Sequence, residues 1–187
     1  MEIGEQKSAA RKAAFVTRRL AHAQGLGQRA CDHLMAHLST LPGVACIAAY
    51  MPIRTEVDPL PVMHDLHKRG IVVSVPVIQG ACRPLLFSRW CPGAPMAAGP
   101  FGALVPETAD YVRPDILITP LVAFDARGYR LGYGGGFYDR TFAELRHEKP
   151  AQAIGFAYGA QEIPVVPVEP TDIRLDAIVT ERGILTF

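Results

Sequence analysis

The sequence predicts an α/β domain of three layers, in which helices cover both faces of a mainly parallel central sheet. Two observations predict this fold class: short, nearly continuous apolar runs recur along the chain, and stretches with helical periodicity separate them. A parallel strand buried between helices needs apolar residues on both of its faces. The chain has 187 residues, 49% of them hydrophobic, so residues 1–187 are expected to form one domain whose core needs no disulfide or metal.

Each expected element follows from its local pattern. Apolar residues at helical spacing predict helices over 5–23, 27–39, 58–69 and 136–147. The apolar runs predict strands over 44–51, 71–78, 116–124, 151–157 and 175–180. Residues 80–112 show neither helical spacing nor a long apolar run. We expect them to form a hairpin and a long loop that cover one end of the sheet. The Pro- and Gly-rich part of this region, 92–106, is a candidate lid.

Composition argues against several classes of partner. The chain has 19 Lys and Arg against 18 Asp and Glu, a net charge of +1, whereas a nucleic-acid binder usually carries a clustered basic excess. It shows no signal peptide, and no apolar run approaches the roughly 18 residues of a membrane span. The four cysteines lack zinc-binding spacing and are expected to be reduced. We expect a soluble, cytoplasmic, monomeric protein that acts on small molecules, without nucleic-acid or membrane partners.

The strongest local signal is a glycine-rich segment, Gly132-Tyr133-Gly134-Gly135-Gly136, between a predicted strand and a predicted helix. Glycines let backbone N–H groups approach a phosphate, and the N-terminus of the next helix favours an anion. The segment has neither the GK[ST] of a P-loop nor the spacing of a dinucleotide fingerprint. Arg130 and Arg140 flank it and favour an anion site, although a flexible surface turn also accounts for the glycines.

Several charged residues near these elements each allow two interpretations. Asp139 is either a Mg²⁺ ligand or the N-cap of the helix that it begins. Lys7 and Arg11, at i and i+4, form either a phosphate-binding pair or a solvated basic face. Asp172 lies before the last predicted strand, where the commoner role of an aspartate is to cap a turn.

The loop after the 44–51 strand holds two carboxylates. Asp58, just before Pro59, is most simply a helix cap. Glu56 has no such local role. It is therefore a candidate functional residue at the carboxyl end of a strand, where α/β sheets bind their ligands.

In combination, these segments resemble one family, the 5-formyltetrahydrofolate cyclo-ligases. GYRLGYGGGFYDR at 128–140 is similar to the family signature G-x-R-L-G-x-G-x-G-Y-Y-D. The other matching segments, from Lys7 to about Glu181, follow in the family's order: the Lys7/Arg11 pair, Glu56, Trp90-x-Pro92-Gly93 and Asp172-x-x-x-Asp176.

The resemblance implies an ATP- and Mg²⁺-dependent conversion of 5-formyltetrahydrofolate to 5,10-methenyltetrahydrofolate, with release of ADP and phosphate. It also implies a fold of the ribose-5-phosphate isomerase/CoA transferase-like kind. Glu56 and Arg130 would be catalytic, and Asp139 and Asp172 would hold Mg²⁺. ATP would contact Lys7, Ser8, Ala9, Ala10, Arg11, Arg130, Leu131, Gly132, Tyr133, Gly134, Gly135, Gly136, Phe137 and Tyr138. The folate would contact Met51, Glu56, Tyr133, Gly134, Gly135, Gly136 and Phe137.

The sequence departs from the family pattern at three positions: Ala10, Phe137 and Thr171 stand where Leu, Tyr and His are usual. None of these changes removes a charged group that the implied reaction needs. Two rival functions remain, an enzyme of the same fold with another substrate and a catalytically silent binding module. A silent module is expected to lose at least one of the implied charged residues, and all of them are present.

Overall fold

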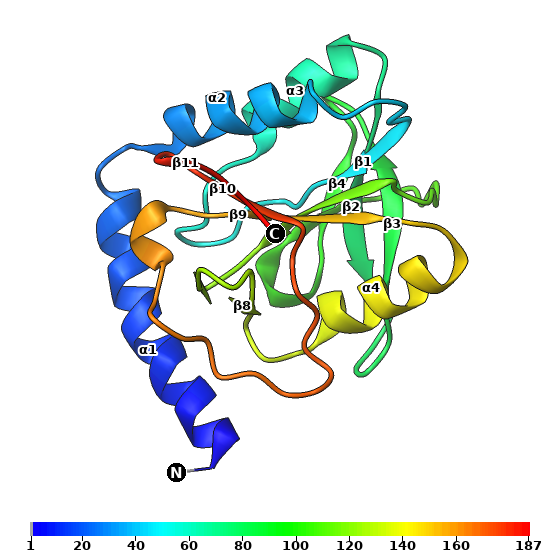
Figure 1. The fold of residues 1–187 in the computed structure, drawn as a ribbon. Coiled ribbons are helices and arrows are strands. Elements are labelled where there is room, and N and C mark those ends of the chain that lie inside the picture. Colours follow the sequence, from blue (N-terminus) through cyan, green and yellow to red (C-terminus); the bar gives the residue numbers. More distant parts are fainter. Residues whose placement is uncertain (1) are drawn as a thin grey trace.

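The computed structural model describes residues 2–187 and contains a seven-stranded central sheet in the order β11-β10-β9-β6-β1-β2-β3 (Figure 1). The five inner strands pair in parallel, whereas β11 and β3 pair antiparallel at the two edges. The mainly parallel sheet predicted from the apolar runs is therefore confirmed. The strands are β1 (Cys46–Ala48), β2 (Val72–Ile78), β3 (Leu85–Trp90), β6 (Ile116–Pro120), β9 (Gln152–Phe156), β10 (Ala177–Thr180) and β11 (Gly183–Thr186).

Helices cover both faces of the sheet (Figure 1). Alternate residues of one strand point to opposite faces, so Leu117 of β6 packs with Phe142 of one helix while its neighbour Ile118 packs with Leu34 of another. Every predicted helix is present, and its ends lie within two residues of the predicted ones. The helices are α1 (Ile3–His22), α2 (Gly27–Leu38), α3 (Leu60–Lys68) and α4 (Phe137–Glu148).

The predicted strand over 116–124 is wrong as one element, because the chain leaves the central sheet after Pro120. The side-chain amide of Gln161 donates hydrogen bonds to the carbonyls of Leu121 and Val122, at 2.8 and 3.0 Å. In a continuing strand, such carbonyls would accept hydrogen bonds from the backbone of a neighbouring strand instead. The chain then forms a separate two-stranded ribbon of β7 (Ala123–Phe124) and β8 (Arg130–Leu131). The glycine-rich segment follows β8 and therefore lies outside the central sheet.

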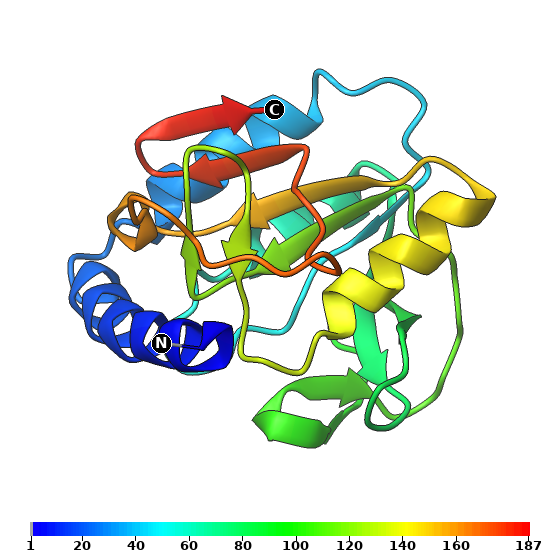
Figure 2. The ribbon, with the colours of Figure 1, turned by 60° about the horizontal axis from the view of Figure 1, so that its bottom comes forward.

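The region 80–112 contains more regular structure than its sequence predicts. Its first part, β3, joins the central sheet beside β2, and residues further on form a small hairpin of β4 (Met96–Ala98) and β5 (Leu104–Pro106). A short 3₁₀ turn, η1 (Pro100–Gly102), connects these two strands, and a second one, η2 (Gly159–Gln161), follows β9. Figure 2 shows the hairpin (green) and the N-terminal part of α1 (dark blue) on either side of the chain that leads into α4.

No helix within residues 2–187 is both long enough and apolar enough to cross a membrane.

Candidate active site

A cavity of about 840 Å³ lies at the carboxyl ends of the parallel strands. Tyr50 and Met51, just after β1, and Pro120, at the end of β6, form its floor. Ligands of open α/β sheets bind at this end of the strands, where the loops diverge. The other walls come from α1, the glycine-rich loop and start of α4, the β4–β5 hairpin, and the C-terminal segment 169–173.

The cavity brings together most of the residues predicted for the site. Met51, Glu56, Lys7, Arg11, Asp139 and Asp172 line it, as does every residue from Arg130 to Tyr138. Ser8 and Ala9 are exposed and Ala10 is partly buried, and none of the three lines the cavity. The helical geometry of α1 explains this difference, because only residues one turn apart share the face that meets the loop.

The glycine-rich loop is held in place by two arginines. Arg11 donates from Nε to the carbonyl of Gly132 at 2.8 Å, and Arg140 donates to the carbonyl of Gly135. Gly134 and Gly136 have φ values of 106° and 63°, which side chains with a Cβ rarely adopt. Gly136 also precedes the first turn of α4, where backbone N–H groups are left for an anion. Hydrogen bonds at two carbonyls argue against a free surface turn.

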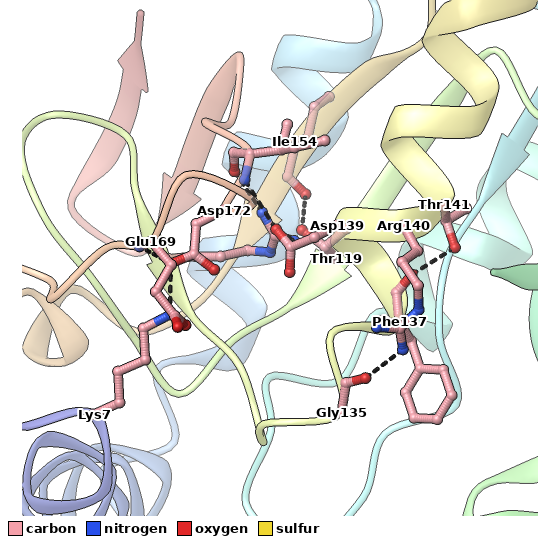
Figure 3. A network of polar contacts seen from close by, with 12 residues as sticks. Lys7, Thr119, Gly135, Phe137, Asp139, Arg140, Thr141, Ile154, Glu169 and Asp172 are labelled. Atoms are coloured by element: carbon pink, nitrogen blue, oxygen red, sulfur yellow. Dashed lines mark hydrogen bonds and ion pairs between the residues drawn. The ribbon is translucent and has the colours of Figure 1, made fainter. Parts of the chain in front are cut away.

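Lys7 belongs to the interior and not to a solvated face. It is 8% exposed, and its Nζ donates to Asp172 at 2.6 Å and to Glu169 at 2.7 Å (Figure 3). Burial lowers the pKa of this amine, but the two carboxylates outweigh burial, so the pKa is raised and the amine stays charged. Arg11, one turn further along α1, makes no ion pair among residues 2–187, and its charge is available to a ligand.

Asp139 does not cap α4, so that interpretation is wrong. It is the third residue of the helix, and its Oδ1 accepts from Nη2 of Arg130 at 2.8 Å and from the backbone N–H of Ile173 at 3.0 Å. Asp172, in the same C-terminal segment, accepts from Lys7 and from the N–H of Glu169 through Oδ2. Each carboxylate is thus fixed through one oxygen.

The carboxylates suit a cation that also binds a ligand. Residues 2–187 contain no group of three or more His, Cys, Asp or Glu side chains arranged around a metal. Mg²⁺ typically takes one or two carboxylates and completes its shell with water and substrate phosphates. Asp139 and Asp172 fit that role better than a site made of protein ligands alone.

Glu56 lines the cavity from the loop after β1 and is buried beside Tyr133 of the glycine-rich loop. It is 4% exposed, and its Oε2 accepts the backbone N–H of Ile53 at 2.9 Å. The tight loop that makes this bond places Arg54 at a φ of 56°. Burial raises the pKa of Glu56, against the lowering effects of the Ile53 N–H, of Arg18 and of the Tyr133 hydroxyl. The second oxygen, Oε1, has no hydrogen-bond partner in the described chain.

Three site features were missed by the sequence analysis. Arg18 is buried behind Glu56 and Tyr133, Glu169 pairs with Lys7, and Phe101 of η1 lines the cavity. The first carried a usable signal, because Arg18 continues the helical face of Lys7 and Arg11 at positions 7, 11, 14 and 18. Glu169 and Phe101 lie in irregular segments, whose neighbours no local pattern indicates.

Asp58, predicted to cap a helix, is not the N-cap of α3, which is Pro59. It precedes the cap, and its carboxylate accepts the N–H of Leu60, the first residue of α3, at 2.9 Å.

Comparison with known proteins identifies the family of the chain. Residues 3–181 match the 5-formyltetrahydrofolate cyclo-ligase family. The 5-formyltetrahydrofolate cyclo-ligase of Escherichia coli (strain K12) is 36% identical over 166 residues, which cover 84% of this chain and 88% of the relative. That of Haemophilus influenzae is 38% identical over 135 residues, which cover 69% of this chain and 72% of the relative.

Solved structures give the same result. The NMR structure of the Aquifex aeolicus 5,10-methenyltetrahydrofolate synthetase superimposes with a TM-score of 0.77 at 28% identity, over 96% of this chain and 92% of that one. The 5,10-methenyltetrahydrofolate synthetase of Mycoplasma pneumoniae gives a TM-score of 0.75 at 26% identity, over 94% and 98%. The chain therefore belongs to the 5-formyltetrahydrofolate cyclo-ligase family, enzymes that convert 5-formyltetrahydrofolate to 5,10-methenyltetrahydrofolate.

Proposed function

We propose that this chain makes 5,10-methenyltetrahydrofolate by using ATP and Mg²⁺ to activate the formyl oxygen of 5-formyltetrahydrofolate, with release of ADP and phosphate. The observation that carries the proposal is one cavity with two different walls. One wall is the glycine-rich loop, which Arg11 holds through a hydrogen bond, together with Lys7. The other wall is the loop after β1, which carries the buried carboxylate of Glu56. The first suits a polyanion, and the second suits a neutral group that presents an N–H.

The nucleotide wall supplies charge and backbone donors. Arg11 holds the loop through Gly132 and keeps its charge free of a carboxylate, and α4 begins at the end of the loop. Phosphoryl transfer depends mainly on positioning and on stabilising charge on the phosphate oxygens. We assign the phosphates of ATP to Lys7, Arg11 and the loop 132–136, with Arg130, Leu131, Phe137 and Tyr138 completing that wall. Ser8, Ala9 and Ala10, which were also predicted to contact ATP, do not line the cavity, and we assign them no contact with the nucleotide.

Asp139 and Asp172 are the residues that fit Mg²⁺. Each has one oxygen engaged in hydrogen bonds and a second oxygen that faces no donor among residues 2–187. A Mg²⁺ ion held by these two carboxylates would also bind the phosphates of ATP and neutralise part of their charge. Arg130 sets the orientation of Asp139 and adds a fixed positive charge beside it.

The reaction balances as two transfers. The formyl oxygen attacks the γ-phosphorus of ATP, and ADP leaves. N10 then attacks the activated carbon, loses its proton, and the C–O bond breaks to release phosphate. Glu56, whose Oε1 has no partner in the described chain, accepts the hydrogen bond from N10–H and takes its proton. Met51, Tyr133, Phe137 and the loop glycines 134–136 hold the folate beside it.

Other features of the chain support a small, self-contained enzyme. The cavity takes residues from Lys7 to Ile173 of a single chain, so we infer that residues 1–187 act as one domain and as a monomer. We also infer that the sheet, with helices on both faces, is of the ribose-5-phosphate isomerase/CoA transferase-like kind.

The direct test is an absorbance assay with 5-formyltetrahydrofolate, ATP and Mg²⁺. We expect the near-ultraviolet absorbance of the methenyl product to rise only when all three are present, and to stop on chelation of Mg²⁺. Glu56→Gln is expected to lower kcat by about 100-fold or more, because the amide cannot take a proton. Product formed without ATP would contradict the activation step, and no product at all would favour another substrate or a silent binding module.

A further inference from the structure

Arg18 is the largest side chain that the fold buries completely. It is 1% exposed, lies on α1, and does not line the cavity. Removing a guanidinium from water is costly unless partners replace the lost hydration. Its partners therefore indicate why the charge is there.

Those partners belong to the two walls of the cavity. Arg18 donates from Nη2 to the hydroxyl of Tyr133 at 2.8 Å, and from Nε to Oγ1 of Thr55 at 3.2 Å. Its Nη1 lies 3.8 Å from Oε1 of Glu56. Tyr133 comes from the glycine loop, whereas Thr55 and Glu56 come from the loop after β1. One buried cation thus joins the two loops that meet at the folate end of the proposed site.

The side chains of Arg18 and Glu56 form an ion pair but no direct hydrogen bond. Nη1 of Arg18 and Oε1 of Glu56 are both buried, and neither has a hydrogen-bond partner within residues 2–187. At 3.8 Å the charges attract each other, but the distance is too long for a hydrogen bond. The cation favours the charged form of Glu56. The hydroxyl of Tyr133, which accepts from Arg18, also lowers the pKa of Glu56, so Arg18 reaches this carboxylate both directly and through Tyr133.

We propose that Arg18 is a positioning residue, which holds Glu56 and Tyr133 in register at the folate end of the cavity and keeps the Glu56 carboxylate charged. This inference rests on the role proposed above for Glu56. Arg18 itself does not touch the substrate.

Arg18 is the main charge that controls Glu56. Arg54, on the same loop, is exposed, so water screens its effect. Burial and the nearby carboxylate raise the pKa values of the tyrosines that surround Glu56, which stay neutral at the pH of the assay; they are Tyr50, Tyr133 and Tyr138. Removing the charge of Arg18 is therefore expected to raise the pKa of Glu56 further.

Three variants test the proposal. Arg18→Met keeps an apolar stem of similar length, Arg18→Lys keeps the charge without the planar fork, and Arg19→Met removes the adjacent, exposed arginine as a matched control. For Arg18→Met we expect the acid limb of kcat/KM for 5-formyltetrahydrofolate to move up by about one pH unit or more. We expect its KM for ATP to stay within about twofold.

The two other variants separate charge from geometry. Arg18→Lys is expected to restore most of the acid limb, yet to retain a raised KM for 5-formyltetrahydrofolate, because one amine cannot serve Thr55, Tyr133 and Glu56 together. Arg19→Met is expected to behave as the wild type. An unchanged acid limb in Arg18→Met, with equal losses for both substrates and a lower Tm, would overturn the proposal and leave Arg18 a structural residue.

A readout without catalysis covers the remaining cases. In protein labelled with ¹³C at glutamate carboxyl carbons, the Glu56 signal is identified by its loss in Glu56→Gln, and its titration is followed in the wild type and in Arg18→Lys. If Arg18→Met does not fold, we compare Arg18→Lys with Arg19→Lys. A Glu56 titration unmoved by both Arg18 variants that fold would refute the coupling. If the wild type turns over no folate, the proposed function fails, and this titration still decides whether Arg18 controls Glu56.

Discussion

Three of the cations that line the cavity differ in how they are paired. Lys7 and Arg130 are each bound to carboxylates that are themselves expected to meet a metal, whereas Arg11 binds only a carbonyl. A cation tied to a metal-binding carboxylate orients that ligand, and a cation free of carboxylates can neutralise a phosphate directly. Asp139 therefore has two separable roles, as the partner of Arg130 and as the proposed ligand of Mg²⁺.

Asp139→Asn separates these roles. The amide keeps an acceptor oxygen for Arg130 and Ile173 but loses the charge that Mg²⁺ needs. We expect the Mg²⁺ concentration for half-maximal activity to rise by about tenfold or more. The free energy of unfolding should fall by about 1–2 kcal/mol, because Arg130 keeps a second acceptor, the carbonyl of Ile173.

Activity titrated with Mg²⁺ and urea unfolding measure the two effects. Glu144→Gln, an exposed acidic residue of the same helix, is the matched control and should change neither. A large loss of stability with an unchanged Mg²⁺ dependence would show that Asp139 acts only through Arg130.

Among the elements, the β4–β5 hairpin is the one placed to cover the cavity. Its connecting turn lines the cavity, and Phe101 in that turn is 74% exposed, with a φ of 61°. The ring of Phe101 meets that of Phe137, at the start of α4, edge to face with centroids 6.4 Å apart. Because Phe101 is exposed and makes one aromatic contact, a ligand bound in the cavity is expected to bury more of its ring.

We therefore expect residues 92–106 to exchange their amide hydrogens more slowly once 5-formyltetrahydrofolate and ATP are bound. Phe101→Ala removes the ring contact and should raise KM for 5-formyltetrahydrofolate by up to about tenfold, because such a pair contributes about 0.5–1.5 kcal/mol. Val165→Ala, an exposed apolar residue that does not line the cavity, is the control. Exchange that is the same with and without substrates would argue against a lid.

At the scale of the whole molecule, the C-terminal segment between η2 and β10 completes the site, and a buried carboxylate anchors it. Asp125 accepts the N–H of Val166 at 2.8 Å and the side chain of Arg127 at 2.6 Å. Burial raises the pKa of Asp125, but these hydrogen bonds outweigh it and the pKa is lowered. The same segment supplies Glu169 and Asp172 to Lys7, 162 and 165 residues away.

Asp125→Asn is expected to lower the free energy of unfolding at pH 7 by about 2 kcal/mol, since it removes charge-assisted hydrogen bonds from a buried site. The lowered pKa makes this contribution complete above the ordinary Asp pKa, and it is lost as the pH falls through the folded-state value. Urea unfolding at several pH values should therefore show the two proteins converging in acid. Asp32→Asn, exposed on α2, is the control; a difference independent of pH would refute the charge argument.

Much of the fold could be predicted because its causes are local. Apolar runs without alternation identified the inner parallel strands, and helical spacing placed all four helices. The edge strand β11 and the break after Pro120 could not be predicted, because they depend on partners elsewhere, such as Gln161. The glycine loop was recognised because its signal, like that of a helix, lies in consecutive residues.

The sequence by itself thus determined the inner strands of the sheet, the helices, the glycine loop and the family, and it placed Lys7 and Arg11 on one face of one helix. Only the tertiary structure decided that this face is buried, that Lys7 meets Glu169 and Asp172, and that Arg18 joins Thr55 to Tyr133. The physical reason is that a charge buried far along the chain from its partners depends on desolvation and pairing, which local periodicity does not encode.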